Sequence, residues 1–214
     1  MDRYLTIPAW RKRSTFTTIQ LTCSTVMKET AMHICLLVID AQESFRHRNY
    51  WNAALADSYL AEQNTLIAEA LSRNIPIVRI LHSDGPEVYD NPFALTSGLV
   101  RPLEGLQDFA AAASFTKHRH SALVDTGLAV WLTENHMHRL IVSGIRTEQC
   151  CETTARHASD LGWAVDYVLD ATLTFDMVQP DGKPLRAADI KMRTATVLEG
   201  RFARVCSVAQ AFSS

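Results

Sequence analysis

Apolar runs and helical stripes alternate along the chain from residue 33 onward. Residues 34–39 form a wholly apolar run that ends at Asp40, a pattern typical of a parallel strand covered on both faces. Apolar residues recur at helical spacing over 57–73, and the apolar run 75–81 predicts the next strand. The same patterns predict further strands over 115–117, 139–143, 164–169 and 203–208, and further helices over 123–134, 148–161 and 187–198.

This alternation of strands and helices indicates an α/β fold. Parallel strands joined by right-handed helical crossovers form a sheet with helices on both faces, so we predict a three-layer α/β/α fold with a central, mainly parallel sheet. We expect a single domain over 32–214, because no repeat or second periodic block interrupts the pattern. Ligands of such sheets bind outside the carboxyl ends of the strands, so the functional residues are expected there.

We predict an N-terminal extension over 1–31 that is either loosely structured or an arm packed on a partner subunit. The segment is rich in Thr and Ser, carries several basic residues and shows no helical or strand period. It lacks the apolar stretch that a secretory signal needs after its basic residues. Whether Met32 is the true start of the protein stays open.

Composition and charge narrow the range of partners. The chain has 214 residues, 47% of them hydrophobic, and its formal net charge of −2 provides no strong field for nucleic acid or an anionic membrane. No apolar run reaches the ~18 residues of a membrane-spanning helix. The five cysteines include no CxxC pair, which favours a reduced, cytoplasmic protein over a disulfide scaffold. We therefore expect a small-molecule substrate, with no nucleic acid or membrane as partner.

Two charged residues adjoin predicted strands. Asp40 directly follows an apolar strand, where an acid either has a chemical task or caps the next segment; burial there would raise its pKa and favour proton transfer. Lys117 lies in a basic cluster with His118 and His120, which is either a solvated surface or the source of a partner for Asp40. The two histidines could share a metal on a strand face, but no nearby carboxylate or cysteine completes a site.

Two adjacent cysteines open the predicted helix over 148–161. With Thr147 as N-cap, Cys150 lies in the first turn, where free N–H groups and the helix dipole favour a thiolate and can bind an oxyanion. The alternative is that both cysteines fill the core. Cys151 begins an inward row of small residues with Ala155, Ala158 and Gly162, whereas Cys150 is rotated away from that row. Cys151 therefore fits a packing role, and Cys150 a functional one.

Three segments together resemble the isochorismatase-like cysteine hydrolases, a superfamily that includes nicotinamidases, N-carbamoylsarcosine amidases and isochorismatases. They are Val-Ile-Asp-Ala-Gln-Glu-Ser-Phe over 38–45, Lys117 ahead of Ser-Ala at 121–122, and Ser-Gly-Ile-Arg-Thr-Glu-Gln-Cys-Cys-Glu-Thr-Thr-Ala-Arg over 143–156. The last is the specific one, because it is similar to the family motif Gly-x-x-Thr-x-x-Cys-Val-x-x-Thr-Ala-Arg. The resemblance covers 32–211 in the same order and spacing.

The resemblance implies an Asp40–Lys117–Cys150 triad on a Rossmann-like sheet. Asp40 would take the thiol proton, Cys150 would attack a carbonyl carbon, and Lys117 would hold the carboxylate and lower the pKa of the thiol. The family's cis peptide falls at Ile145–Arg146 and would set the N–H groups of Arg146 and Cys150 as an oxyanion hole. Water would then cleave the thioester, with Asp40 relaying protons in both halves.

The sequence departs from the family pattern after the second strand. Metal-binding members carry Asp-x-His there, and this chain does not, so we expect no metal and no other cofactor; whether His82, Asp84 or Glu87 binds a metal stays open. The complete triad favours hydrolysis of a C–N bond in a small amide, ureide or carbamoyl compound. The alternatives are an isochorismatase-type vinyl-ether hydrolase and a catalytically silent Rossmann-like binding scaffold.

Two further expectations concern the pocket and the assembly. Strand-end geometry predicts that substrate contacts Phe45, Trp51, His82 and Phe175. The family resemblance implies a homo-oligomer, a dimer or tetramer, and the apolar stretch 109–113 with Trp131 is the candidate contact surface.

Overall fold

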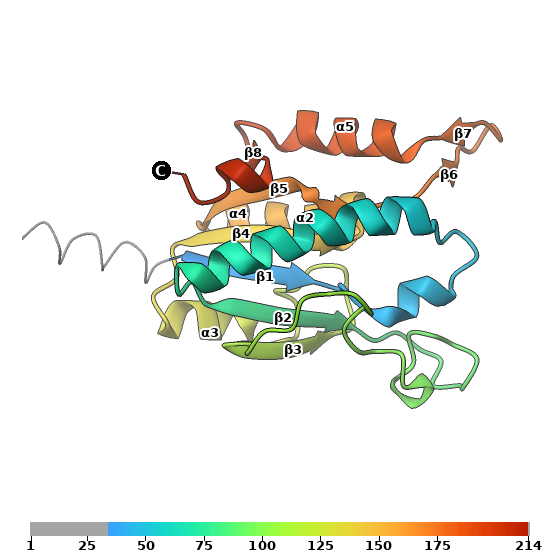
Figure 1. Ribbon diagram of the computed structural model, residues 1–214, viewed down its shortest axis with the longest axis horizontal. Helices are drawn as coiled ribbons and strands as arrows, with labels where there is room; N and C mark the ends of the chain where they lie inside the picture. The colour runs from blue at the N-terminus through green and yellow to red at the C-terminus, as the bar shows by residue number, and fades with distance from the viewer. Residues whose placement is uncertain (1–33, 214) are drawn as a thin grey trace, which may run out of the picture.

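Six parallel strands form the centre of the molecule, in the order β3-β2-β1-β4-β5-β8 (Figure 1). The computed structural model describes residues 34–213. The sheet strands are β1 (Ile34–Ile39), β2 (Ile77–His82), β3 (Ala113–Lys117), β4 (Arg139–Ile145), β5 (Ala164–Leu173) and β8 (Arg204–Cys206). The longer helices are α2 (Ala53–Ser72), α3 (Leu128–Glu134), α4 (Glu152–Asp160) and α5 (Ala187–Leu198). A two-stranded antiparallel hairpin, β6 (Met177–Val178) and β7 (Pro184–Leu185), precedes α5.

The sheet separates two apolar layers, as the predicted α/β/α architecture requires. Alternate residues of β1 point to opposite faces: Leu36 and Val38 pack with α2, and Leu37 and Ile39 pack with α3 and α4. Figure 1 shows α2 in front of the sheet, with α3 and α4 behind it. The three-layer fold with a parallel sheet in one domain is therefore confirmed.

Close contact between β1 and β4 sets the geometry of the carboxyl edge. Ile39 of β1 pairs with Gly144 of β4, and a Cβ atom on Gly144 would lie 1.8 Å from the Ile39 carbonyl oxygen. Gly144 also has φ +128°, a conformation that side chains disfavour. Asp40, the residue after β1, lies in the left-handed region of backbone conformation, with φ 52°. Only glycine at 144 therefore lets the segments after β1 and β4 approach each other.

Several predicted boundaries differ from the structure. The helix predicted over 57–73 begins earlier, at Ala53, because the Asn52 side chain accepts the N–H of Leu55. The helix predicted over 123–134 begins later, at Leu128, because Thr126 bonds back to the Ala122 carbonyl. The strand predicted over 164–169 continues to Leu173, where it pairs again with β4 after a register shift.

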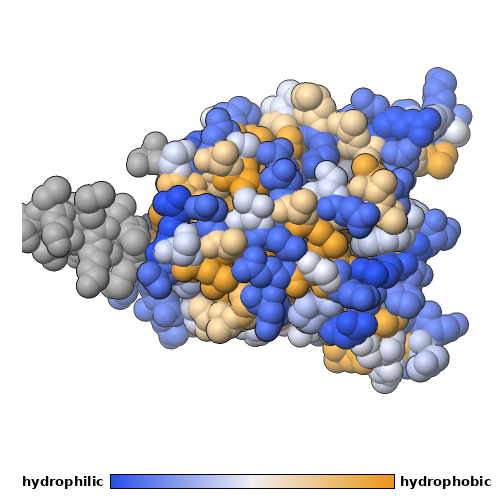
Figure 2. Space-filling model, in the orientation of Figure 1, coloured by the Kyte–Doolittle hydropathy of each residue, from blue (hydrophilic) through white to orange (hydrophobic). Residues whose placement is uncertain are grey.

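The remaining sequence expectations lie partly outside the described residues. The predicted extension over 1–31 is outside them. Phe109, placed by the sequence in a subunit contact surface, is instead 6% exposed and part of the chain's own core. Among residues 34–213, no helix is long and apolar enough to cross a membrane. Figure 2 shows hydrophilic and apolar side chains interspersed on the face that carries α2.

Candidate functional site

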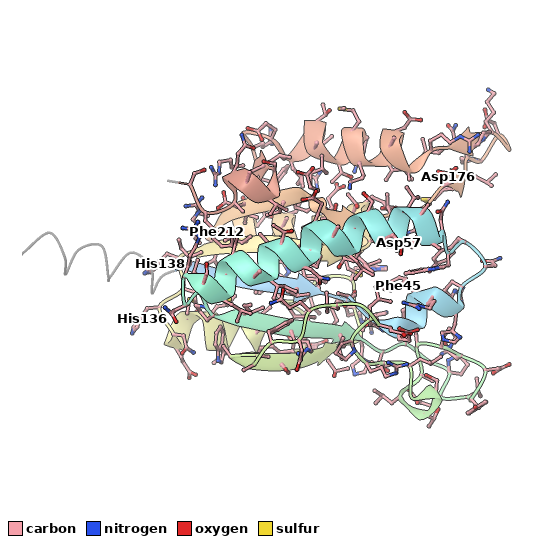
Figure 3. The ribbon with its side chains drawn as sticks, in the orientation of Figure 1. Phe45, Asp57, His136, His138, Asp176 and Phe212 are labelled. Carbon is pink, nitrogen blue, oxygen red and sulfur yellow. The ribbon has the colours of Figure 1, made fainter. Side chains whose placement is uncertain are left out.

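Three polar residues from separate strands meet at the carboxyl edge of the sheet. Asp40 follows β1, Lys117 is the last residue of β3, and Cys150 lies in the turn between β4 and α4. Figure 3 places Phe45 at this end of the molecule and His136 and His138 at the opposite end. The topology therefore brings the predicted catalytic residues together, although more than one hundred residues separate the first from the last.

The Lys117 ammonium is the centre of the cluster. Its Nζ lies 2.8 Å from Asp40 Oδ2 and 3.2 Å from Cys150 Sγ, and both charged side chains are fully buried. The same nitrogen lies 3.1 Å from the carbonyl oxygen of Arg119 and 3.3 Å from Nδ1 of His82. His82 and Lys117 are register partners at the ends of β2 and β3. A buried cation is thus surrounded by acceptors, as the high cost of burying an unpaired charge demands.

Burial and charge act against each other on the Asp40–Lys117 pair. Burial raises the pKa of Asp40, and the Lys117 charge only partly offsets this. Burial would lower the pKa of Lys117, but the charges of Asp40 and Cys150 raise it overall. Lys117 is therefore an ammonium at neutral pH, and the Asp40 carboxylate has a higher proton affinity than that of an exposed aspartate.

The Cys150 thiol differs from the sequence expectation. Burial, followed by the charge of Asp40, raises the pKa of Cys150 to about 12, and the Lys117 charge does not compensate. The expected pKa below that of free cysteine is therefore wrong for the ligand-free protein. Cys150 is a thiol at neutral pH, and its proton must move to a base before or during attack on a substrate.

The turn that carries Cys150 is π-helical and covers Thr147–Cys151. Thr147 is not an N-cap as predicted, because its hydroxyl bonds to Thr172 of β5 at 2.9 Å. The hydroxyl of Tyr167 donates to the Thr147 carbonyl at 2.6 Å, and the Cys151 N–H donates to the Arg146 carbonyl five residues back. The α-helix begins only at Glu152, after both cysteines.

The two cysteines of this turn occupy different surroundings. Cys151 is fully buried and packs in the apolar layer with α4 residues Ala155 and Ala158. Cys150 is 5% exposed and lines a cavity.

Arg146 follows a cis peptide bond with Ile145. Its side chain is nearly buried and is not among the residues that line the cavity described below. Its Nη2 pairs with Glu148 Oε1 at 3.0 Å. The guanidinium also stacks on Tyr50, 5.2 Å from the ring centroid. The charge of the Arg146 side chain is therefore balanced by Glu148 inside the fold. The group of Arg146 that the resemblance assigns to the oxyanion hole is its backbone N–H.

A cavity of about 310 Å³ opens above the Cys150 sulfur. Its wall is partly aromatic and partly polar, and the lining residues are Phe45, Arg48, Tyr50, His82, Asp84, Gly85, Asn91, Phe93, His120, Gln149 and Cys150. Asp40 and Lys117 are not among them. The cavity therefore exposes the sulfur to a small ligand and keeps its charged partners in the interior.

The predicted lining residues divide into two pairs. Phe45 and His82 line this cavity, and Phe45 packs edge-to-face on Phe93 at 5.0 Å. Trp51 and Phe175 do not line it: Phe175 packs on Trp51, with ring centroids 5.5 Å apart, and on the lining residue Tyr50, at 5.1 Å. The sequence located the correct loops, but strand-end position does not show which aromatic ring faces inward.

His120 and Tyr50 are lining residues that the sequence prediction of the pocket missed. His120 Nδ1 lies 3.8 Å from Cys150 Sγ, and its ring is exposed to the cavity. Its place three residues after Lys117 was the available signal. Within the part of the chain that the structure describes, no group of three or more His, Cys, Asp or Glu side chains is arranged to hold a metal ion.

The sequence is similar to those of known proteins. The Isochorismatase domain model matches residues 34–210. The isochorismatase family protein YrdC of Bacillus subtilis is 25% identical over 184 residues, which cover 82% of this chain and 92% of that protein. Nicotinamidase 3 of Arabidopsis thaliana is 42% identical over 60 residues, which cover 28% of this chain and 30% of that protein.

Comparisons of structure agree. An isochorismatase from Pseudomonas putida KT2440 superposes with a TM-score of 0.73 at 26% identity, covering 85% of this chain and 91% of that chain. A cysteine hydrolase from Pseudomonas syringae pv. phaseolicola shares the fold, with a TM-score of 0.75 at 21% identity, covering 84% of this chain and 91% of that chain. With a family model that matches nearly all of the described residues, the chain belongs to the isochorismatase family and is a hydrolase.

Proposed function

We propose that this hydrolase cleaves the C–N bond of a small amide, ureide or carbamoyl compound through a thioester on Cys150. The observation that carries the proposal is the position of Lys117 Nζ, 2.8 Å from Asp40 and 3.2 Å from the Cys150 sulfur. Of these three residues, Cys150 is the one that lines the cavity. A base, a cation and a nucleophile in contact are the groups that covalent acyl transfer needs.

The first half of the reaction forms the thioester. Asp40 takes the thiol proton as the sulfur attacks the carbonyl carbon, which avoids a free thiolate at a site that disfavours one. Lys117 stays charged and balances the negative charge that passes between Asp40 and Cys150. The C–N bond then breaks, and Asp40 passes its proton to the leaving nitrogen, which departs as ammonia or an amine.

The developing oxyanion needs hydrogen-bond donors beside the sulfur. We assign this role to the backbone N–H groups of Arg146 and Cys150, in the turn that follows β4. The carbonyl of Arg146 accepts hydrogen bonds from the N–H groups of Gln149 and Cys151, each at 3.2 Å, which fixes this turn. Preorganised donors of this kind stabilise a tetrahedral intermediate without reorganisation.

The alternative within the family is hydrolysis of a vinyl ether. Such a reaction does not require the cysteine as nucleophile, whereas here Cys150 faces the cavity in contact with Lys117. The curated relative from Arabidopsis is named a nicotinamidase, a name that denotes cleavage of an amide. Both observations favour C–N cleavage. The cavity volume, near the lower end of ordinary ligand pockets, favours a small substrate.

A screen of small amides, ureides and carbamoyl compounds for release of ammonia tests the proposal. We expect at least one compound to be turned over by the wild-type protein and not by Cys150→Ala. Release of pyruvate from isochorismate, with no ammonia from any amide and with activity kept in Cys150→Ala, would establish the vinyl-ether reaction instead. Absence of turnover in both assays would indicate a silent binding scaffold.

A further inference from the structure

Two residues of opposite charge line the cavity without pairing with each other. Arg48 follows the 3-10 helix η1 (Glu43–His47) after β1, and Asp84 lies in the loop after β2. Both residues are exposed. Among residues 34–213 neither forms an ion pair, so more than 4 Å separates the guanidinium from the carboxylate. These two wall charges, Arg48 and Asp84, are therefore free to meet a ligand.

The charged side chains closer to the interior already have partners. Lys117 contacts Asp40, and Arg146 pairs with Glu148. His82 also lines the cavity, but burial and the Lys117 charge lower its pKa to about 4, so its ring is neutral at neutral pH. A charged group on a ligand is therefore expected to bind one of the wall charges.

The surrounding loops hold both wall charges in place. The Asp84 N–H donates to the Phe93 carbonyl at 3.0 Å, and the Asp84 carbonyl accepts a hydrogen bond from Asn91 Nδ2 at 2.7 Å. The Arg48 guanidinium lies over the Tyr50 ring, 5.8 Å from its centroid. A cation and an anion on one cavity wall are complementary to a ligand that carries both charges itself.

We propose that the substrate is a zwitterionic amino acid with an amide at the end of its side chain, an inference that rests on the function proposed above. Arg48 binds the α-carboxylate, and Asp84 binds the α-ammonium. The reacting amide is on the side chain, because an α-amide would leave no carboxylate for Arg48. Hydrolysis consumes one water and releases ammonia and the corresponding acidic amino acid.

The rest of the cavity suits such a ligand. The side-chain carbonyl meets the Cys150 sulfur, and the rings of Phe45 and Phe93 offer apolar contact to the methylene groups. The volume of about 310 Å³ favours an amide over the larger ureido group.

Analogues that lack one charge test each half of the proposal. L-Asparagine and L-glutamine carry both charges, succinamic and glutaramic acids lack the ammonium, 3-aminopropanamide and 4-aminobutanamide lack the carboxylate, and propionamide and butanamide lack both. Ammonia release is measured with the wild type, and binding by calorimetry with Cys150→Ala, which forms no thioester. For at least one of the two amino acids, we expect each missing charge to lower kcat/KM and affinity about tenfold or more, the usual contribution of a hydrogen bond to a charged group.

Two substitutions should give a crosswise pattern that a structural defect would not produce. Arg48→Gln should lose the preference for the carboxylate and keep the preference for the ammonium, and Asp84→Asn should do the reverse. Arg101→Gln and Asp90→Asn are the matched controls, because they change the net charge equally at exposed residues that do not line the cavity. We expect the controls to behave as the wild type.

Four outcomes would overturn the inference. They are no binding of either amino acid, equal binding and hydrolysis of the uncharged amides, preference for an analogue with a single charge, and an equal loss of affinity for all ligands in Arg48→Gln and Asp84→Asn. Failure of the proposed function would look different. In that case no amide would release ammonia, whereas the amino acids would still bind Cys150→Ala with the expected dependence on both charges.

Discussion

The side-chain amide of Gln42 pairs with both backbone groups of His82. Its Oε1 accepts the His82 N–H at 2.7 Å, and its Nε2 donates to the His82 carbonyl at 2.9 Å and to the Ser44 hydroxyl at 2.8 Å. Gln42 is fully buried. The amide thus makes the pair of hydrogen bonds that a neighbouring strand would make with His82. It holds the end of β2 at the position where His82 contacts Lys117.

Replacing Gln42 by Leu is expected to destabilise the protein by about 2–3 kcal/mol, because the backbone N–H and C=O of His82 lose their partner in the interior. Turnover of the remaining folded protein is expected to fall as well, since His82 and Lys117 lose a fixed position. Urea unfolding and steady-state assays measure the two effects.

Gln63→Met is the matched control for Gln42→Leu. Gln63 is equally buried, but its Nε2 has no hydrogen-bond partner and its Oε1 accepts only a 3.3 Å bond from Tyr59. We expect a change below about 1 kcal/mol. Equal losses in the two variants would show that burial alone, and not the clamp on His82, sets the effect.

The adjacent cysteines are expected to respond in opposite ways. Cys150→Ala should abolish turnover and remain folded, because the removed atom faces the cavity. Cys151→Ala should keep substantial activity and lose about 1 kcal/mol of stability through a small internal void. Turnover and thermal unfolding of both variants measure this difference.

Cys151→Ser is a second test of whether Cys151 has a packing role. It places a hydroxyl in an apolar layer, so we expect a greater loss of stability than for Cys151→Ala. If Cys151→Ala were inactive and Cys150→Ala active, the nucleophile would be the buried residue, and the assignment of the cavity as the site would be wrong.

Local pattern was sufficient where an element depends on its own residues. The run 34–39 and the stripe 187–198 coincide with β1 and α5. The pattern did not predict local structure that depends on side chains far away in the sequence. The π-helical turn before α4 depends on Tyr167 and Thr172, which bond to Thr147 from β5. No periodicity within 147–161 contains that information.

Part of the candidate site could be predicted from the sequence. Asp40 and Cys150 follow apolar strands, Lys117 ends a shorter one, and the family resemblance implied that the three residues act together. His120 could not be assigned, because its sequence neighbours read as a basic surface and its partner is 30 residues away. The thiol pKa was also out of reach, since it depends on how far burial outweighs one adjacent lysine. A motif can indicate that a charged residue lies near the thiol, but it does not show how deeply the thiol is buried.

Gly144→Ala is expected to be the most damaging small substitution near the site. The added Cβ would meet the Ile39 carbonyl at 1.8 Å, and φ +128° is strained for alanine, so β1 and β4 would have to separate. We expect a loss above about 4 kcal/mol, seen as insoluble or unfolded protein.

Gly182→Ala is the control that measures the cost of placing alanine at a positive φ without a steric clash. Gly182 also has a positive φ, +85°, but no atom lies within 4 Å of the added Cβ. A loss of about 1–2 kcal/mol is expected from its left-handed backbone. A comparable loss at both positions would mean that conformation, and not the contact with β1, makes Gly144 necessary.

Turnover and thiol alkylation are expected to depend on pH in different ways. If Asp40 removes the thiol proton, turnover requires the Asp40 carboxylate, which is present above its pKa. Burial raises that pKa, so activity should fall on acidification at a higher pH than for an exposed aspartate. Alkylation by iodoacetamide requires a thiolate. Because the pKa of Cys150 is raised to about 12, alkylation should be slow at neutral pH and should increase only in alkaline solution.

The two pH profiles discriminate between a base-assisted thiol and a preformed thiolate. Alkylation of Cys150→Ala gives the background from the other cysteines, and peptide mapping confirms the modified residue. Lys117→Met removes the charge that favours the Asp40 carboxylate, so the acid limb of any remaining turnover should move to higher pH. If wild-type turnover and alkylation instead rose together through one pKa, Cys150 would react as a thiolate, and Asp40 would serve only to hold Lys117 in place.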